Sequence, residues 1–163
     1  MKYCILFFYF ITLLVQPNQV TAQPDHIVGE TTEAEIRSTF RIFDLYTKRY
    51  QPDSTSIQYL SSVTDSISII TVLGTWCKDS RKHIPSLFKT LRLTDNPMLH
   101  AEYIGVDYFK KDPSNAYNTY NLKANPTILV FKSSVEIGRI TEEPAQSIEK
   151  DLAKIIKSAA KNR

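Results

Sequence analysis

Apolar positions along the chain alternate between helical and strand spacing. Where apolar residues recur every three or four positions, the pattern predicts an amphipathic helix. The predicted helices cover 33–49, 77–93, about 112–120 and 142 to the carboxyl end. The first follows Thr32-x-x-Glu35, a capping box. The third starts at Asp112-Pro113, and proline is typical of a first helical turn.

Runs rich in β-branched residues predict strands between these helices. The predicted strands cover 66–73, 100–106, 127–131 and 135–141. Residues 24–31 read as an extended polar lead-in, and residues 55–65 indicate neither helix nor strand clearly. Strands that are spaced by helices and end in a hairpin predict an α/β fold, in which helices cover both faces of a mixed sheet.

The first 22 residues have the layout of a secretory signal peptide. Lys2 gives a positive start, residues 5–15 are almost entirely apolar, and residues 20–22 fit a cleavage site. The apolar run has about half the ~20 residues that a membrane-spanning helix needs, although an uncleaved anchor stays an alternative. We predict export over 1–22 to the periplasm or extracellular space, and a mature domain over 23–163 without membrane contact.

Length and composition narrow the classes of function. A chain of 163 residues fits one domain, and its net charge of +3 is too small to indicate nucleic acid or an anionic membrane. Its three histidines lie far apart, so we expect no metal site, and nothing indicates a cofactor. Cys77 is the one cysteine of the predicted mature domain. A lone cysteine in an oxidising compartment pairs with another molecule or stays a reactive thiol.

The stretch 74–82 places Cys77 at the first turn of a predicted helix, directly after a buried strand. Backbone N–H groups and the helix dipole at such a position favour the thiolate over the thiol. Nearby basic residues add to this effect, namely Lys78, Arg81 and Lys82, while Asp79 opposes it. The Ser80 hydroxyl can face the sulfur and donate a hydrogen bond to it. These features predict an activated nucleophile, and the alternative is an inert structural cysteine.

The Trp-Cys-x-x-Ser sequence at 76–80, after a buried strand, resembles the active-site layout of thioredoxin-like proteins. Pro85 also stands where that family places a proline in the active-site helix. The resemblance covers about 65–160 and is strongest to secreted bacterial proteins with a Trp-Cys-x-Asp-Ser site. It implies a thioredoxin-like fold with a mixed four- to five-stranded sheet, to which the helical segment of about 32–50 is an addition.

The resemblance also implies roles for individual residues. Asn125-Pro126 stands where the family carries a cis-proline that faces the active-site cysteine. The implied catalytic residues are Cys77, Ser80 and Trp76, with Trp76 shaping the rim beside the sulfur. The implied substrate-binding residues are Asn125, Pro126 and Thr75. The backbone of Asn125 would pair with an extended substrate segment, in the manner of strand addition.

Three positions depart from the family. Ser80 stands where thioredoxins carry the resolving cysteine, Thr71 where they keep a buried acid, and Asn125 where they have an apolar or β-branched residue. Because Ser80 forms no internal disulfide, the sequence predicts monothiol exchange on protein disulfides or low-molecular-weight thiol adducts. An external thiol would then release the mixed disulfide.

Two other functions stay open at this point. The first alternative is a non-catalytic binding or chaperone-like module that has lost its resolving cysteine. The second is a dimer linked by a Cys77–Cys77 bridge. Otherwise we expect a monomer. The aromatic residues between 103 and 120 are interpreted as packing residues rather than as part of a site.

Overall fold

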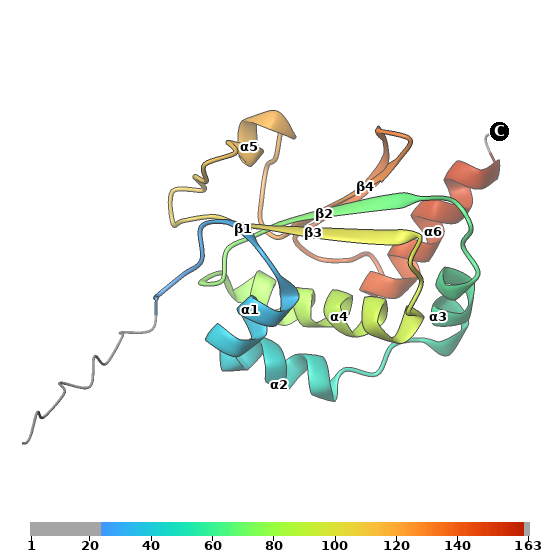
Figure 1. Ribbon diagram of the computed structural model, residues 1–163, viewed down its shortest axis with the longest axis horizontal. Coiled ribbons are helices and arrows are strands. Elements are labelled where there is room, and N and C mark those ends of the chain that lie inside the picture. The colour runs from blue at the N-terminus through green and yellow to red at the C-terminus, as the bar shows by residue number, and fades with distance from the viewer. Residues whose placement is uncertain (1–23, 162–163) are drawn as a thin grey trace, which may run out of the picture.

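The computed structural model describes residues 24–161, so the predicted signal peptide lies outside the described residues. Five strands form one mixed sheet with helices packed against it (Figure 1). The strands are β1 (Gly29–Thr31), β2 (Ile67–Leu73), β3 (Leu99–Gly105), β4 (Thr127–Lys132) and β5 (Val135–Thr141). The helices are α1 (Glu33–Thr39), α2 (Arg41–Arg49), α3 (Ser54–Ser61), α4 (Lys78–Thr94), α5 (Ala116–Thr119) and α6 (Ile148–Lys161). This arrangement confirms the expected α/β class.

The strand order is β1-β3-β2-β4-β5, which places β2 at the centre of the sheet. β2 runs parallel to β3 and antiparallel to β4, and β5 pairs antiparallel with β4 at the sheet's end. The side chains of Ile67, Ile69 and Leu73 on β2 are fully buried. Because β-branched residues pack well on a pleated surface, this apolar run forms the central strand.

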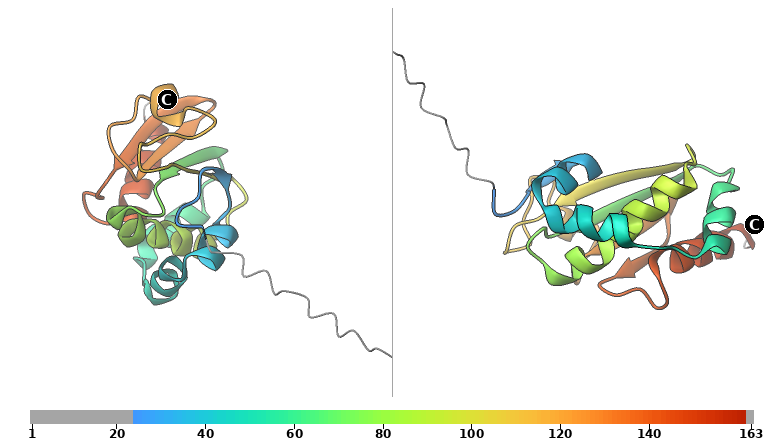
Figure 2. Two further views of the ribbon diagram at one scale, coloured as in Figure 1. Left: turned by 90° about the vertical axis from the view of Figure 1, so that its left-hand side faces the viewer. Right: turned by 90° about the horizontal axis from the view of Figure 1, so that it is seen from below.

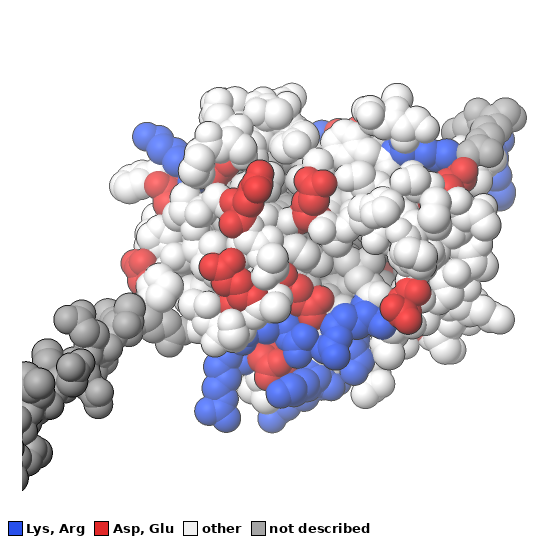
Figure 3. Space-filling model, viewed as in Figure 1, with Lys and Arg blue, Asp and Glu red and all other residues white. Residues whose placement is uncertain are grey.

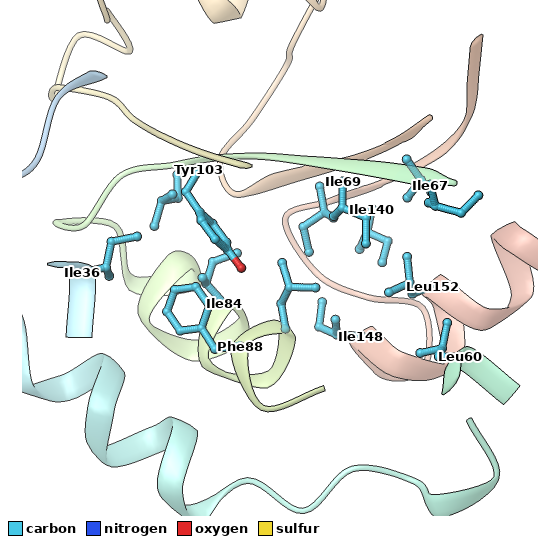
Figure 4. Packing of buried hydrophobic residues seen from close by; sticks show 14 of the residues in the cluster. Ile36, Leu60, Ile67, Ile69, Ile84, Phe88, Tyr103, Ile140, Ile148 and Leu152 are labelled. Atoms are coloured by element: carbon cyan, nitrogen blue, oxygen red, sulfur yellow. The ribbon is translucent and has the colours of Figure 1, made fainter. Parts of the chain in front are cut away.

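The two faces of the sheet are covered very unequally. Figures 1 and 2 show α1, α2, α3, α4 and α6 on one face, while α5 lies on the other. Between the sheet and the large helical layer, Ile69, Ile84, Phe88 and Leu152 belong to the main hydrophobic core (Figure 4). A smaller apolar cluster around Val72 lies on the α5 side. Both faces carry helices as expected, but the second carries only a single turn.

The amino-terminal part departs from the sequence prediction. The expected helix over 33–49 is two helices, α1 and α2, which are separated at Phe40, where the backbone is extended. The Phe40 and Phe43 rings pack edge to face with centroids 6.5 Å apart, so the break directs both rings into the core. The lead-in at 24–31 contains β1, which pairs antiparallel with β3. The segment of about 32–50 is therefore tied into the sheet through β1.

Two further helices differ from their predicted ranges. The ambiguous segment 55–65 holds most of α3, whose first turn is capped by the Asp53 carboxylate, which accepts the Ser56 N–H at 2.8 Å. The last helix begins at Ile148 instead of at the Glu-Glu-Pro sequence before it. The Asp151 carboxylate accepts the Ala145 N–H at 2.5 Å, and the segment before Ile148 stays outside the helix.

The helix predicted over about 112–120 is reduced to α5. The Asp112 carboxylate accepts the N–H groups of Ser114 and Ala116, at 2.8 and 2.9 Å. Such local bonds to an aspartate compete with helix formation, so a turn replaces the expected first helical turn. The loop from β3 to α5 starts at the end of the sheet where β2 and β3 both finish.

Charges on the described surface are of mixed sign. In Figure 3, Lys and Arg gather over the helical layer around α2, with Asp and Glu nearer to the strands. Arg37 and Lys48 each pair with Asp44, both with an N–O distance of 2.7 Å. Opposite charges therefore offset one another on α1 and α2. Within residues 24–161, no helix is long and apolar enough to cross a membrane, and no group of three or more His, Cys, Asp or Glu residues could hold a metal ion.

Glu149 is a buried carboxylate that joins the amino-terminal helices to α6. It accepts the hydroxyls of Tyr50 and Ser147, each at 2.7 Å, and the N–H of Asp53 at 3.1 Å. Burial acts to raise the pKa of Glu149, but these hydrogen bonds outweigh it and hold that pKa below its usual value. Burial of the phenol and its bond to Glu149 together raise the pKa of Tyr50 to about 12. The folded state therefore favours an ionised Glu149.

We expect Glu149→Gln to lower the free energy of unfolding by about 1–3 kcal/mol at neutral pH, because charge-assisted hydrogen bonds are lost. The pKa of Glu149 is lower in the folded chain than its ordinary value of 4.5. Its contribution is therefore present above that value and is lost as the pH falls through the folded pKa. Urea unfolding at neutral and acidic pH measures the difference between variant and wild type, which should shrink in acid. Glu102→Gln, at an exposed position of β3, is the matched control; equal losses in both variants would contradict the prediction.

Candidate functional site

The turn between β2 and α4 is folded around Trp76. The Trp76 indole N–H donates to the Val106 carbonyl at 3.0 Å, and its ring stacks on Tyr108 with centroids 4.9 Å apart. Gly74 makes this possible, because a Cβ at Gly74 would lie 2.7 Å from the indole ring. The rim predicted at Trp76 is therefore built from two loops, one after β2 and one after β3.

Cys77 is the N-cap residue of α4 and is half-buried. Its thiol donates to the backbone carbonyl of Asn125 with an Sγ–O distance of 3.4 Å. The Asn125–Pro126 peptide bond is cis, in agreement with the resemblance. Cys77 and the Asn125-Pro126 pair are thus brought together from segments 48 residues apart in the sequence. The sulfur lies at the amino-terminal end of a 17-residue helix, where the helix dipole favours negative charge.

Asn125 finds a partner that the sequence did not indicate. Its side chain is only 5% exposed, and its Oδ1 accepts the Tyr117 hydroxyl at 2.6 Å. Burial raises the pKa of Tyr117, and the charges of Cys77 and Glu142 act in the same direction. The sequence alone predicts only a packing role for Tyr117. A buried polar residue such as Asn125 needs a hydrogen-bond partner, and a search for that partner in the sequence could have pointed to Tyr117.

The hydrogen bond that the sequence predicts from the Ser80 hydroxyl to the sulfur is not formed. The Ser80 side chain is fully buried, and its hydroxyl has no hydrogen-bond partner within the described part of the chain. The reason is the helical period, because Ser80 shares a face of α4 with Ile84 and Leu87, both of which are buried in the core. Thr71 on β2 is also fully buried, and its hydroxyl likewise lacks a partner among residues 24–161.

Thr75 has a structural role in the turn before Cys77, and its role in substrate binding stays a prediction. It is fully buried, its hydroxyl accepts the Ile27 N–H at 3.1 Å, and its carbonyl accepts the Arg81 Nε–H at 2.7 Å. The Ile27 carbonyl in turn lies against Gly105, where a Cβ would approach it to 2.4 Å. Thr75 therefore anchors the amino-terminal segment beside the site.

The three basic residues predicted to act on the sulfur have different surroundings. Arg81 is bound to the turn through Thr75, and Lys78 is exposed. Lys82 forms an ion pair with Glu143 at 2.7 Å, which raises the pKa of Lys82 and lowers that of Glu143. The carboxylate of Glu143 therefore offsets the charge of Lys82, and Asp79 adds a negative charge in the first turn of α4.

Comparisons with known proteins concern the fold alone. No protein-family model matches the chain, and no curated protein sequence matches it. A protein of unknown function from Pseudomonas aeruginosa is 16% identical, with a TM-score of 0.64 over 81% of this chain and 94% of that one. An HIV epitope-scaffold protein is also 16% identical, with a TM-score of 0.62 over 80% and 94%. Thioredoxin O2 from Arabidopsis thaliana is 22% identical, with a TM-score of 0.41 over 64% and 83%.

The fold is thioredoxin-like. The central strand β2 lies between a parallel β3 and an antiparallel β4, and the sheet ends in the β4–β5 hairpin. A half-buried cysteine begins the helix after the central strand and faces a cis-proline segment before β4. These features agree with the fold that the Trp-Cys-x-x-Ser sequence implied.

The unpartnered hydroxyl behind the site leads to a stability prediction. We expect Thr71→Val to raise the free energy of unfolding by about 1 kcal/mol, because it removes a buried hydroxyl that makes no hydrogen bond and keeps the side-chain shape. Thr47→Val is the matched control, since the buried Thr47 hydroxyl donates to the Phe43 carbonyl at 2.8 Å. Urea unfolding of both variants should give opposite signs, and a destabilised Thr71→Val would contradict the prediction.

Proposed function

We propose that this chain carries out thiol–disulfide exchange with Cys77 as its single nucleophile, in an exported compartment. The observation that carries the proposal is the position of the Cys77 sulfur. It lies half-exposed at the amino-terminal end of α4, 3.4 Å from the Asn125 carbonyl. A helix amino terminus stabilises a thiolate, and an adjacent backbone carbonyl can pair with an extended substrate segment. The thioredoxin-like fold supports a redox role in general.

The proposed reaction has two exchange steps. The Cys77 thiolate attacks one sulfur of a substrate disulfide, a new bond to Cys77 forms, and the other substrate sulfur leaves as a thiolate. An external thiol then attacks the mixed disulfide, releases Cys77 as a thiolate and becomes bonded to the substrate sulfur. The Ser80 hydroxyl is buried and is not a thiol, so it takes no part in release. The substrates that fit are protein disulfides or low-molecular-weight thiol adducts.

Two features support the remaining parts of the proposal. The signal-peptide pattern over 1–22 supports export to the periplasm or the extracellular space. Arg81 and Lys78 belong to the first turn of α4, directly after Cys77 in the sequence. We propose a monomer in solution, because a Cys77–Cys77 bridge would consume the nucleophile. Non-reducing electrophoresis separates these two states.

One observation favours a second candidate function. Both positions that serve resolution in thioredoxins hold buried neutral hydroxyls, Thr71 and Ser80. A chain that binds polypeptides without turnover would retain the same site geometry. It would form complexes with peptides but give no exchange above that of free thiols.

Cys77→Ala should reduce exchange to the rate of the small thiol alone, because it removes the only thiol of the predicted mature domain. The assay measures release of a peptide from a peptide–glutathione mixed disulfide, with excess small thiol as the external reductant. Ser80→Ala is the matched control and should keep the wild-type rate, because its hydroxyl makes no bond to the sulfur. Exchange in Cys77→Ala above the rate of the small thiol alone would refute the proposed function. Peptide binding without exchange in the wild type would favour the second candidate.

Ser80→Cys should create a dithiol that reduces insulin with dithiothreitol as the electron source. The new thiol would stand three residues after Cys77, on the spacing that permits an internal disulfide in thioredoxins. Thr90→Cys is the matched control, because Thr90 is a buried hydroxyl residue on the same helix. Thirteen residues of helix separate it from Cys77, about 20 Å at 1.5 Å per residue. Equal activity of the two variants would contradict the prediction.

A further inference from the structure

The side chain of Tyr117 connects the one-turn helix α5 to the reactive sulfur. Its hydroxyl donates to Asn125 Oδ1 at 2.6 Å, and the Asn125 backbone carbonyl accepts the Cys77 thiol at 3.4 Å. A short, part-buried hydrogen bond of this kind fixes the orientation of the Asn125 amide side chain. Two consecutive contacts therefore link α5 to Cys77 through a single buried residue.

Tyr117 also lines a surface cavity of about 530 Å³. Phe109, which is 81% exposed, and Lys110 line the same cavity. The Lys110 ammonium lies 5.4 Å from the centre of the Tyr117 ring, a cation–π distance. A substrate segment that enters this cavity would touch the same tyrosine that holds Asn125. The exposed Phe109 ring suits an apolar side chain of a polypeptide better than a small polar thiol.

We propose that Tyr117 is a positioning residue that holds Asn125 in place for polypeptide substrates, so that the site prefers polypeptide disulfides to small disulfides. This inference rests on the proposed function. A buried amide that loses its only hydroxyl donor must turn to find another partner, and its backbone turns with it. The Asn125 carbonyl beside Cys77 then no longer pairs with the backbone of an extended substrate. The reaction with a small disulfide needs no backbone pairing and is unaffected.

The test compares two disulfides that carry the same coloured leaving group. One joins thionitrobenzoate to the cysteine of an apolar peptide, and the other is the symmetric dithiobis-nitrobenzoate. In both reactions the Cys77 thiolate attacks sulfur, a Cys77 disulfide forms, and thionitrobenzoate leaves with the bonding electron pair. Stopped-flow absorbance gives the second-order rate constant for each disulfide.

We expect Tyr117→Phe to slow the reaction with the peptide about tenfold and the reaction with the small disulfide by less than about twofold. Asn125→Val should give the same split. The double variant should be no slower than either single variant, because the two residues act through one contact. Tyr120→Phe is the matched control, since Tyr120 closes the same helix and packs on Phe131, with ring centroids 6.1 Å apart. It should leave both rates unchanged.

Equal slowing with both disulfides, or no slowing with either, would overturn the role of Tyr117. Circular dichroism establishes that each variant is folded, and Asn125→Val decides the question if Tyr117→Phe does not fold. Failure of the proposed function looks different, because the wild-type chain would then react with neither disulfide faster than a free thiol does. That result would overturn both inferences before any variant is made.

Discussion

The site depends on the burial of β2 between β3 and β4. Because β2 and β3 are parallel, both strands finish at the same end of the sheet, and the antiparallel β4 begins there. Cys77 follows β2, Val106 follows β3 and Asn125 precedes β4, so the pairing of three strands brings these residues together. Parallel strands buried on both faces need near-continuous apolar runs, and β2 supplies one. A loosened β2 would separate the sulfur from the carbonyl that it contacts.

Much of this fold could be predicted from local pattern. The strands β2, β3, β4 and β5 and the helix α4 lie close to their expected ranges, because their apolar spacing agrees with their tertiary burial. β1 was missed because it has three residues and little apolar character, and it forms a strand only against the free edge of β3. The break at Phe40 could not be predicted either, since it depends on where the Phe40 and Phe43 rings meet the core.

The site was predictable in part for a similar reason. Trp76, Cys77 and Pro126 belong to linear motifs that identify them without knowledge of the tertiary structure. Tyr117 lies on the one-turn helix α5, and only the tertiary structure brings its hydroxyl to Asn125, so a linear pattern did not single it out. The expectation for Ser80 failed because spacing along a helix gives the face that a side chain occupies and not the atom that it contacts.

The neutral hydroxyl residues Thr71 and Ser80, which lie buried in the core near Cys77, are consistent with one another in physical terms. A buried carboxylate at Thr71 would cost several kcal/mol unless it had a partner or a task in proton transfer, whereas an unpartnered hydroxyl costs about 1–3 kcal/mol. In the proposed exchange Ser80 supplies no resolving thiol, so no proton has to be moved in the core between β2 and α4. A neutral residue at Thr71 is then the less costly choice. The proposed chemistry is then confined to the half-buried Cys77, and the thiol that ends the proposed reaction has to arrive from solvent.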